Sequence, residues 1–311
     1  MIVRFWGVRG SIPTPLTPEQ IQSKIMAVIQ RARPSDLESA ESRAKFLASV
    51  PSWIYGTAGG NTACVEIKAG DAEFVLDAGS GIRVFGKSQN LPADNHYNLF
   101  FSHFHWDHIQ GLPFFDAAFN PTSTFDVYTG FANARESLVK QMECPYFPVP
   151  FESFTKNFTF HQLTPGETYY IGGVEVRTCF MSHPGGSYSY SFKYKGKKVV
   201  YATDVELKIS DYVITPESRA VFEGADCIIL DAQYTAEEAF RKENWGHSSF
   251  CYAIDFAAFW KIGKLYMFHH EPTYDDRKLN SILQAARWYA NYINRAKVEI
   301  HLAKESSEIE L

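Results

Sequence analysis

Cysteine is scarce in this chain of 311 residues, which contains five (Cys64, Cys144, Cys179, Cys227 and Cys251). They are scattered, form no CxxC pair and show no spacing typical of a disulfide framework. An odd number of well-separated cysteines is typical of buried thiols in a reducing compartment. We therefore expect a protein without disulfides, located in the cytoplasm.

Long apolar runs and an excess of positive charge are also missing. No run of 18 apolar residues occurs, and the N-terminal stretch MIVRFWGVRG has no apolar signal region, so we expect neither a membrane partner nor export. The formal net charge is −5 and no basic stripe is visible, which weighs against a long nucleic acid as ligand. A small-molecule partner is favoured.

The chain is rich in core-forming residues: 45% are hydrophobic and 15% aromatic. We expect one domain over residues 1–311, because no repeat or low-complexity linker divides the chain. Helical periodicity appears over 131–142, 247–260 and 275–293, and strand-like runs fill most of the rest. Strands interspersed with helices predict a layered α/β fold. The runs are TACVEIK, AEFVLDAG, NLFFS, FDVYT, NFTFHQL, YIGGVEVRTCFM, YSYSFKY, KKVVYATD, DCIILDA, KLYMFHH and VEIHLA.

Residues 17–50 form a separate helical block between the first strand and the rest of the sheet. Thr17, Pro18 and Gln20 form a capping box, and apolar residues then recur at helical spacing until Pro34. The stretch SDLE offers a second capping box before a helix ending near Pro51. We therefore predict an inserted helical hairpin. Three roles fit it: a cover over the active site, contact with the second subunit of a homodimer, or packing on the core.

The stretch HFHWDH concentrates ligand-type side chains after the strand that ends at Ser102. It contains His103, His105, Asp107 and His108, which we place on the loop leaving the carboxyl end of that strand, the usual address of catalytic groups in open α/β sheets. Imidazole and carboxylate donors suit Zn²⁺, with Mn²⁺ or Fe as alternatives. His103 and His105 can point at one metal, while Asp107 and His108 would face a second.

Four ligands cannot complete two sites, so further ligands must follow at other strand ends. His183 follows the run VEVRTCFM, Asp204 ends KKVVYATD, and His269 and His270 end KLYMFHH. Each alone is more often structural than functional, but together and in this order they predict a pair of metal sites.

This order of ligands resembles the metallo-β-lactamase superfamily of hydrolases. The stretches FWGVRGSIPTP, GGNTACVEI, FVLDAGSGIR, PYFPVPF, SHPGGSYSYSF, VVYATD and FHHEP extend the similarity over nearly the whole chain. They resemble a subgroup labelled cyclic-nucleotide phosphodiesterase-like and related to ribonuclease Z. The resemblance implies a four-layer αββα sandwich, here with the inserted hairpin near residues 17–50.

The resemblance also implies a set of metal ligands. His103, His105 and His183 would bind the first of two divalent ions, Asp107, His108 and His269 the second, and Asp204 would bridge both. We choose His269 over His270 because it follows the apolar strand directly. Such a pair of metals would activate a shared water to a bridging hydroxide that attacks a phosphodiester.

Further residues receive supporting roles. Asp107 and His247 are the candidate catalytic groups: the segment DAQYTAEEAFRKENWGHSSF resembles one in ribonuclease Z in which a histidine assists proton transfer. His247 could equally be a helix-terminus residue. Five more residues are expected around the metals or the substrate: Asp77, His270, Asn61, Ser187 and Phe147. Asp77 would orient a ligand histidine or cap a turn, and Asn61 would lie at the cleft edge or in a turn. Ser187 would lie near a phosphate oxygen, and Phe147 would belong to a wall that stacks on a base.

Several functions remain open at this point. The leading one is a two-metal hydrolase that cleaves small cyclic nucleotides or related phosphodiesters. The alternatives are a ribonuclease Z-like endonuclease, for which no Gly- and Lys-rich arm is visible, a thioester or lactone hydrolase on the same metal core, and a metal-bound sensor module without catalysis.

Overall fold

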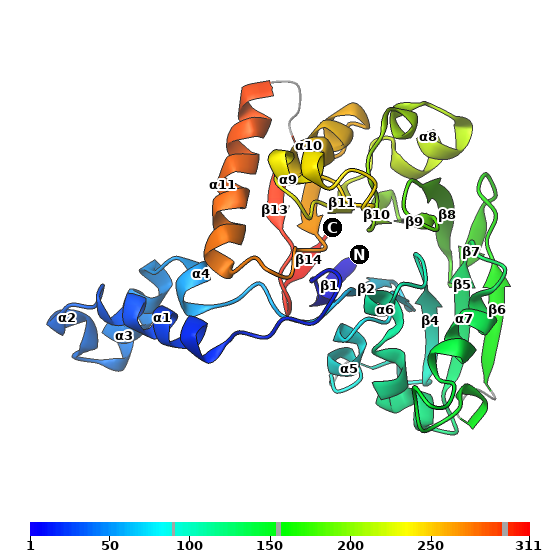
Figure 1. Ribbon diagram of the computed structural model, residues 1–311, viewed down its shortest axis with the longest axis horizontal. Helices are drawn as coiled ribbons and strands as arrows, with labels where there is room; N and C mark the ends of the chain where they lie inside the picture. Colours follow the sequence, from blue (N-terminus) through cyan, green and yellow to red (C-terminus); the bar gives the residue numbers. More distant parts are fainter. Residues whose placement is uncertain (89–90, 154–156, 294–297) are drawn as a thin grey trace.

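Two mixed β-sheets form the centre of the molecule (Figure 1). The computed structural model describes residues 1–88, 91–153, 157–293 and 298–311, and within these ranges each sheet has seven strands. The first sheet has the order β14-β1-β2-β3-β4-β5-β6 and the second β13-β12-β11-β10-β9-β8-β7. The strands of the first are β1 (Ile2–Gly7), β2 (Cys64–Ala69), β3 (Ala72–Leu76), β4 (His96–Phe100), β5 (Thr124–Thr129), β6 (Phe158–Gln162) and β14 (Glu308–Glu310). Those of the second are β7 (Tyr169–Ile171), β8 (Val174–Met181), β9 (Ser187–Tyr194), β10 (Lys197–Ala202), β11 (Cys227–Asp231), β12 (Lys264–Phe268) and β13 (Glu299–Leu302).

The alternation of side chains along the buried strands builds three hydrophobic layers. On β11, Ile228 faces the outer helices, whereas its neighbour Ile229 lies in the cluster between the sheets. That central cluster includes Phe74 and Phe192, whose ring centroids are 5.0 Å apart. Because both faces of each sheet are covered, the central strands read as nearly continuous apolar runs.

Helices cover the outer faces of both sheets and complete the four layers (Figure 1). On the first sheet these are α5 (Gly81–Phe85) and α7 (Ala134–Gln141). On the second they are α8 (Pro216–Phe222), α10 (Phe250–Phe259) and α11 (Asp276–Ile293). The predicted αββα sandwich is therefore confirmed.

Strand direction gathers several loops at one edge of each sheet. Strands β3 to β6 pair in parallel, and so do β10 to β13. The residues after β4, β10, β11 and β12 therefore leave at the carboxyl ends of parallel strands, where ligand sites form in open α/β folds.

Every predicted strand run contains a strand, but three local predictions need correction. The run YIGGVEVRTCFM is split into β7 and β8 by Gly172 and Gly173, whose φ angles of 54° and 78° make a tight turn. Asp107 and His108 lie on a short helix, α6 (Trp106–Ile109), and not on a loop. The helix predicted over 247–260 begins at Phe250, because the Ser249 side chain caps it.

The inserted block 17–50 projects from the sandwich as an arm (Figure 1). Thr17 caps α1 (Pro18–Ile29) with the predicted capping box. The predicted second helix is broken into α2 (Pro34–Leu37) and α3 (Ala40–Ser49), since Ser39 and Ser42 form a capping box in place of SDLE. A short helix, α4 (Ser52–Tyr55), connects the arm to the sandwich.

All five cysteines are free; Cys64 and Cys227 are buried, but Cys144 is exposed. Within the described ranges, no helix is both long and apolar enough to cross a membrane.

Candidate metal centre

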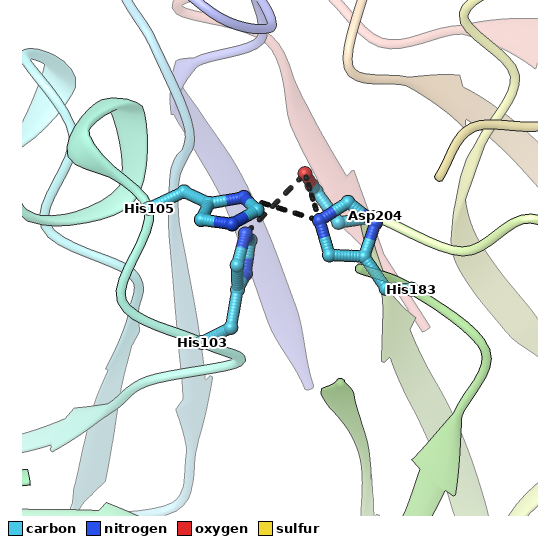
Figure 2. A group of neighbouring side chains, drawn as sticks. All are labelled: His103, His105, His183 and Asp204. Atoms are coloured by element: carbon cyan, nitrogen blue, oxygen red, sulfur yellow. Dashed lines mark hydrogen bonds and ion pairs between the residues drawn. The ribbon is translucent and has the colours of Figure 1, made fainter. Parts of the chain in front are cut away.

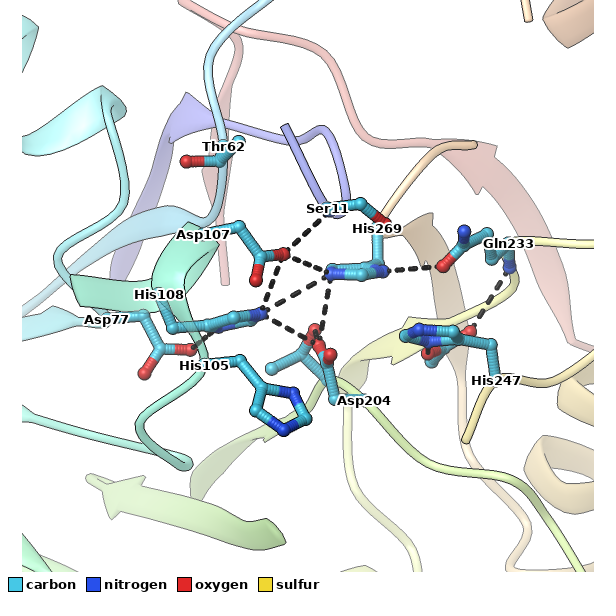
Figure 3. A network of polar contacts seen from close by, with 12 residues as sticks. Ser11, Thr62, Asp77, His105, Asp107, His108, Asp204, Gln233, His247 and His269 are labelled. Carbon is cyan, nitrogen blue, oxygen red and sulfur yellow. Dashed lines mark hydrogen bonds and ion pairs between the residues drawn. The ribbon is translucent and has the colours of Figure 1, made fainter. Parts of the chain in front are cut away.

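Five histidines and two aspartates from both sheets converge at the edge where the parallel strands end (Figures 2 and 3). Four different strands supply them: residues 103–108 follow β4, His183 follows β8, Asp204 follows β10 and His269 follows β12. The seven form two groups of four that share Asp204, and the ligand-type atoms in each group lie within 4.8 Å of one another. The groups are His103, His105, His183 and Asp204, and Asp107, His108, Asp204 and His269.

The first group surrounds a small space with nitrogen atoms on three sides (Figure 2). His105 Nδ1 and His183 Nε2 are 3.1 Å apart. Asp204 Oδ2 lies 3.5 Å from His103 Nε2 and 3.8 Å from His183 Nε2. One carboxylate oxygen of Asp204 thus faces this group.

The second group is more deeply buried and uses the other oxygen of Asp204 (Figure 3). Asp204 Oδ1 lies 3.1 Å from His108 Nε2 and 3.2 Å from His269 Nε2. Asp107 Oδ2 lies 3.1 Å from His269 Nε2 and also accepts the backbone N–H of Ser11 at 2.7 Å. Asp204 therefore stands between the two groups, one oxygen toward each.

The outer nitrogens of four histidines are held by fixed acceptors. His108 Nδ1 pairs with Asp77 Oδ2 at 2.7 Å, His183 Nδ1 with the carbonyl of Gly246 at 2.8 Å, and His269 Nδ1 with Gln233 Oε1 at 2.9 Å. His103 Nδ1 lies 3.0 Å from the hydroxyl of Ser102, which donates its own proton to Asp77. Each outer nitrogen therefore carries a proton, and each Nε2 points inward with a lone pair.

The inward-facing Nε2 atoms are arranged as ligands of a cation. His108 Nε2 faces His269 Nε2 at 3.3 Å, and the buried His103 Nε2 has no hydrogen-bond partner among the described residues. A buried polar atom without a partner costs free energy. Imidazole nitrogens and carboxylate oxygens are ligands for Zn²⁺, Mn²⁺ or Fe, so the residues present fit a pair of divalent cations.

Electrostatics acts differently on the rings of the two groups. Burial lowers the pKa of His103 well below its usual value, and also lowers the pKa of His105 and of His183, so these rings are neutral. Burial acts to raise the pKa of Asp204, but the charges of His108 and His269 outweigh it and hold that pKa well below its usual value. Burial acts to lower the pKa of His108, but the carboxylates of Asp204, Asp107 and Asp77 outweigh it and hold that pKa well above its usual value. A cation bound here would displace the proton of this ring, because neutral imidazoles and ionised carboxylates are the forms that bind metals.

Strained backbone conformations are concentrated at this edge. Asp77, Asp204 and His269 have φ angles of 56°, 51° and 58°, a region that residues other than glycine rarely adopt. Such conformations cost about 1–3 kcal/mol each and persist where the surrounding structure enforces them.

Two glycines let the backbone approach ligand rings: a Cβ on Gly10 would lie 2.4 Å from the His269 ring, and one on Gly246 would lie 2.4 Å from His183 Nδ1.

Asp77 is the hub of the supporting network. Its carboxylate accepts from the Ser102 N–H and hydroxyl at 2.8 Å each and from the Tyr201 hydroxyl at 2.7 Å, in addition to His108. The carboxylate therefore fixes the ring of His108 and the loop that begins at Ser102.

The structure places the other predicted supporting residues away from the ligand atoms. His270 Nε2 donates to the carbonyl of Ala303, and burial lowers its pKa to about 3. Asn61 pairs with Glu305 through its backbone N–H at 2.5 Å and its side-chain amide at 3.1 Å. Ser187 is buried, and its hydroxyl donates to the carbonyl of Thr203. Phe147 packs edge-on against Phe114 and against the helix-covered face of the first sheet.

His247 lies next to the second group, with its ring stacked on that of His269 at a centroid distance of 4.8 Å (Figure 3). Its Nδ1 contacts Asp231 Oδ2 at 2.7 Å, so its Nε2 is the nitrogen available to a substrate. Burial acts to lower the pKa of His247, but the Asp231 carboxylate outweighs it and raises that pKa to about 9. The Asp231 carboxylate therefore favours the protonated form of the ring.

The supporting residues that sequence reasoning missed include Asp231, Gln233, Ser11 and Gly246. Asp231 is the last residue of β11 and Gln233 lies two residues further on, so the strand-end rule that found Asp204 could have indicated them. No local signal marks Ser11 or the carbonyl of Gly246.

Comparisons with known proteins agree with this geometry. A family model described as a β-lactamase superfamily domain matches residues 73–270, a range that contains all seven converging residues. A ribonuclease Z from Thermoplasma acidophilum is 24% identical over 269 residues, which cover 72% of this chain and 84% of that protein.

Solved structures share the whole architecture. The metallo-β-lactamase fold protein YhfI from Bacillus subtilis superposes with a TM-score of 0.66 at 17% identity, over 100% of this chain and 98% of that one. A diphosphatase from the PhnP family gives 0.63 at 16% identity, over 100% and 96%. Because the family model covers well over half of the chain, and the fold and convergent histidines agree with it, the chain belongs to the β-lactamase superfamily of hydrolases, as the resemblance predicts.

Proposed function

We propose that this chain is a two-metal phosphodiesterase that acts on small phosphodiesters. One observation carries the proposal: the side chains of seven residues face inward in two groups that share Asp204, and His247 stands beside them. The relatives include a ribonuclease and a diphosphatase, whose substrates both contain phosphate esters or anhydrides.

Each of the two groups would supply the ligands of one cation. His103, His105 and His183 would hold one cation, Asp107, His108 and His269 the other, and Asp204 would contact both. When bound, such a pair would supply an acidified water as nucleophile and offset the charge of the phosphodiester. Zinc is the metal we expect first, with manganese or iron as alternatives.

The chain itself controls the positions of these groups and one proton. Ser11 holds the Asp107 carboxylate in place, and Asp77 holds the ring of His108. His247 Nε2 would give its proton to the leaving alkoxide, while Asp231 orients the ring through Nδ1. The loss of either partner would slow the departure of a poor leaving group.

Small substrates are favoured over RNA by charge. The chain carries 35 acidic residues against 30 lysines and arginines, which gives no surplus of cations to neutralise a polynucleotide. The similarity to ribonuclease Z is the observation that supports an endonuclease as second candidate.

A substrate panel tests the proposal. The protein is loaded with zinc or manganese and assayed with bis-p-nitrophenyl phosphate, cyclic nucleotides, precursor tRNA and a thioester. We expect turnover of the first two, and a loss of roughly a thousandfold in Asp204→Ala, about 4 kcal/mol of transition-state stabilisation. Asp71→Ala, at an exposed hairpin turn, is the matched control. Turnover of the thioester alone, of the tRNA alone, or of nothing would contradict the proposal.

A further inference from the structure

A hollow of about 780 Å³ adjoins the candidate metal centre on the far side of His247. It lies between residues 206–212, which follow β10, the helix α9 (Ala236–Arg241) and the start of α10. His247 lines the hollow and also stacks on His269, so its ring borders both the hollow and the second ligand group. A volume of this size is typical of sites for small organic ligands.

Three apolar side chains from different elements are exposed at the hollow. Ile209 is 91% exposed, Phe240 85% and Tyr252 52%. Exposed aromatic side chains that gather beside a concave site are a mark of ligand binding. Phe240 and Tyr252 offer ring faces on which a planar group can stack.

The charges at the hollow exclude a second phosphate. Three carboxylates line it (Glu206, Glu243 and Asp255) against two basic groups, the Lys208 ammonium and the His247 imidazole. The Lys208 ammonium donates to Asn244 Oδ1 at 3.1 Å and lies 3.9 Å from the Glu206 carboxylate, so it is already paired. An anion placed here would meet net negative charge.

The three carboxylates differ in the hydrogen bonds that they already accept. Glu206 accepts the backbone N–H groups of Asn244 and Gly246, and Asp255 accepts the Tyr289 hydroxyl. Among the residues that the structure describes, the Glu243 carboxylate has no hydrogen bond or ion pair and is free to accept an N–H from a ligand.

We propose that this hollow binds the leaving alcohol of the substrate and selects one that carries a neutral heteroaromatic ring with N–H donors, as an adenosine does. The inference rests on the proposed function, because it is His247 that would protonate the leaving oxygen at the mouth of the hollow. The ring lies against Phe240 and Tyr252, and Glu243 accepts its N–H. Phe147, which packs on the opposite side of the first sheet, is not part of this subsite.

Paired substrates measure what the ring contributes. Adenosine 2′,3′-cyclic phosphate and glycerol 1,2-cyclic phosphate present the same reacting group, but only the first has a base. We expect the wild-type protein to prefer the first, and Phe240→Ala to lower this preference about tenfold, since base–aromatic stacking contributes about 1–3 kcal/mol. Turnover of the glycerol compound should not change. Tyr170→Ala, which removes a 73% exposed ring on β7, is the matched control.

Binding of the free nucleoside separates this inference from the proposed function. Equilibrium dialysis of adenosine against the protein as purified needs no turnover, and we expect Phe240→Ala and Glu243→Ala to bind it about tenfold more weakly than Tyr170→Ala does. If Phe240→Ala and Tyr170→Ala bind adenosine alike and keep the same substrate preference, the subsite is overturned even though phosphodiesters are cleaved. If neither cyclic phosphate is cleaved but the difference in adenosine binding holds, the proposed function fails and the nucleoside site stands.

Discussion

The arm formed by residues 17–50 and the edge that carries the ligand groups differ in burial and in the sequence separation of their contacts. No side chain of α1, α2 or α3 is buried, and the caps of α1 and α3 join residues three apart. At the ligand edge His103, Asp107, His108, Asp204 and His269 are buried, and His108 meets His269 across 161 residues of sequence.

This difference shows where function can reside in the chain. Local hydrogen bonds are enough to define a helical arm, whereas the ligand groups exist only when both sheets are packed together. We therefore expect changes at the ligand edge to abolish activity and changes in the arm to leave it nearly intact. Four predictions test this comparison.

Removal of metal should have the largest effect. Dialysis against a chelator is expected to reduce phosphodiester turnover at least about a thousandfold. The ligand residues of the two sheets would then lose the cations that link them, so hydrogen exchange should accelerate at residues 103–108 and 267–270 but not in 17–50. Equal acceleration in the arm would contradict the comparison.

Loss of the proton donor should matter only for poor leaving groups. His247→Ala is expected to lower kcat about a hundredfold for a diester with an alkoxide leaving group, and a few-fold at most for p-nitrophenolate, which departs without a proton. Asp231→Asn should show the same pattern more weakly, since it removes the partner of Nδ1. His301→Ala on β13 is the control, and equal losses for both substrates would show a merely structural role.

Displacement of one ligand ring should have an intermediate effect. Gly246→Ala places a Cβ 2.4 Å from His183 Nδ1, and we expect metal affinity to fall roughly tenfold or more. Gly224→Ala is a close control, because Gly224 also has a positive φ, of 65°, but a Cβ there would meet no atom of the described residues within 4 Å. Titration of the metal-free variants with zinc measures both. Equal affinities would show that the close approach of Gly246 does not position His183.

Release of the arm should have the smallest effect. Lys24 in α1 contacts Asp276 at 2.8 Å and donates to the carbonyls of Trp53 and Gly56, which attach the arm to α11 and α4. Lys24→Met is expected to speed hydrogen exchange in 17–50, while turnover of a small diester stays within about twofold. Lys45→Met, at an exposed pair with Glu41, should change neither. A tenfold loss of turnover in Lys24→Met would make the arm part of the site.

The sequence predicts the strands and the convergence of the ligand residues because both follow from strong local patterns. Alternating apolar runs mark the strands, and His183, Asp204 and His269 each follow one directly. The strand β14 was not predicted, since its three residues form a strand only through pairing with β1.

Residues that act through distant backbone atoms could not be found in this way. Ser11 reaches Asp107 through its N–H, and Gly246 reaches His183 through its carbonyl, so the side chains of neither carry a signal. In the arm, Ser35 and Ser39 both offer caps, and the structure uses Ser39, whose side chain accepts the N–H of Ser42.

The number of cations bound per chain tests the central claim most directly. The protein is saturated with zinc, freed of excess ion by gel filtration, and its metal content is measured by mass spectrometry. We predict two zinc ions per wild-type chain, and fewer in Asp204→Ala, whose single carboxylate serves both groups. A wild-type chain that retains one ion or none would contradict the account.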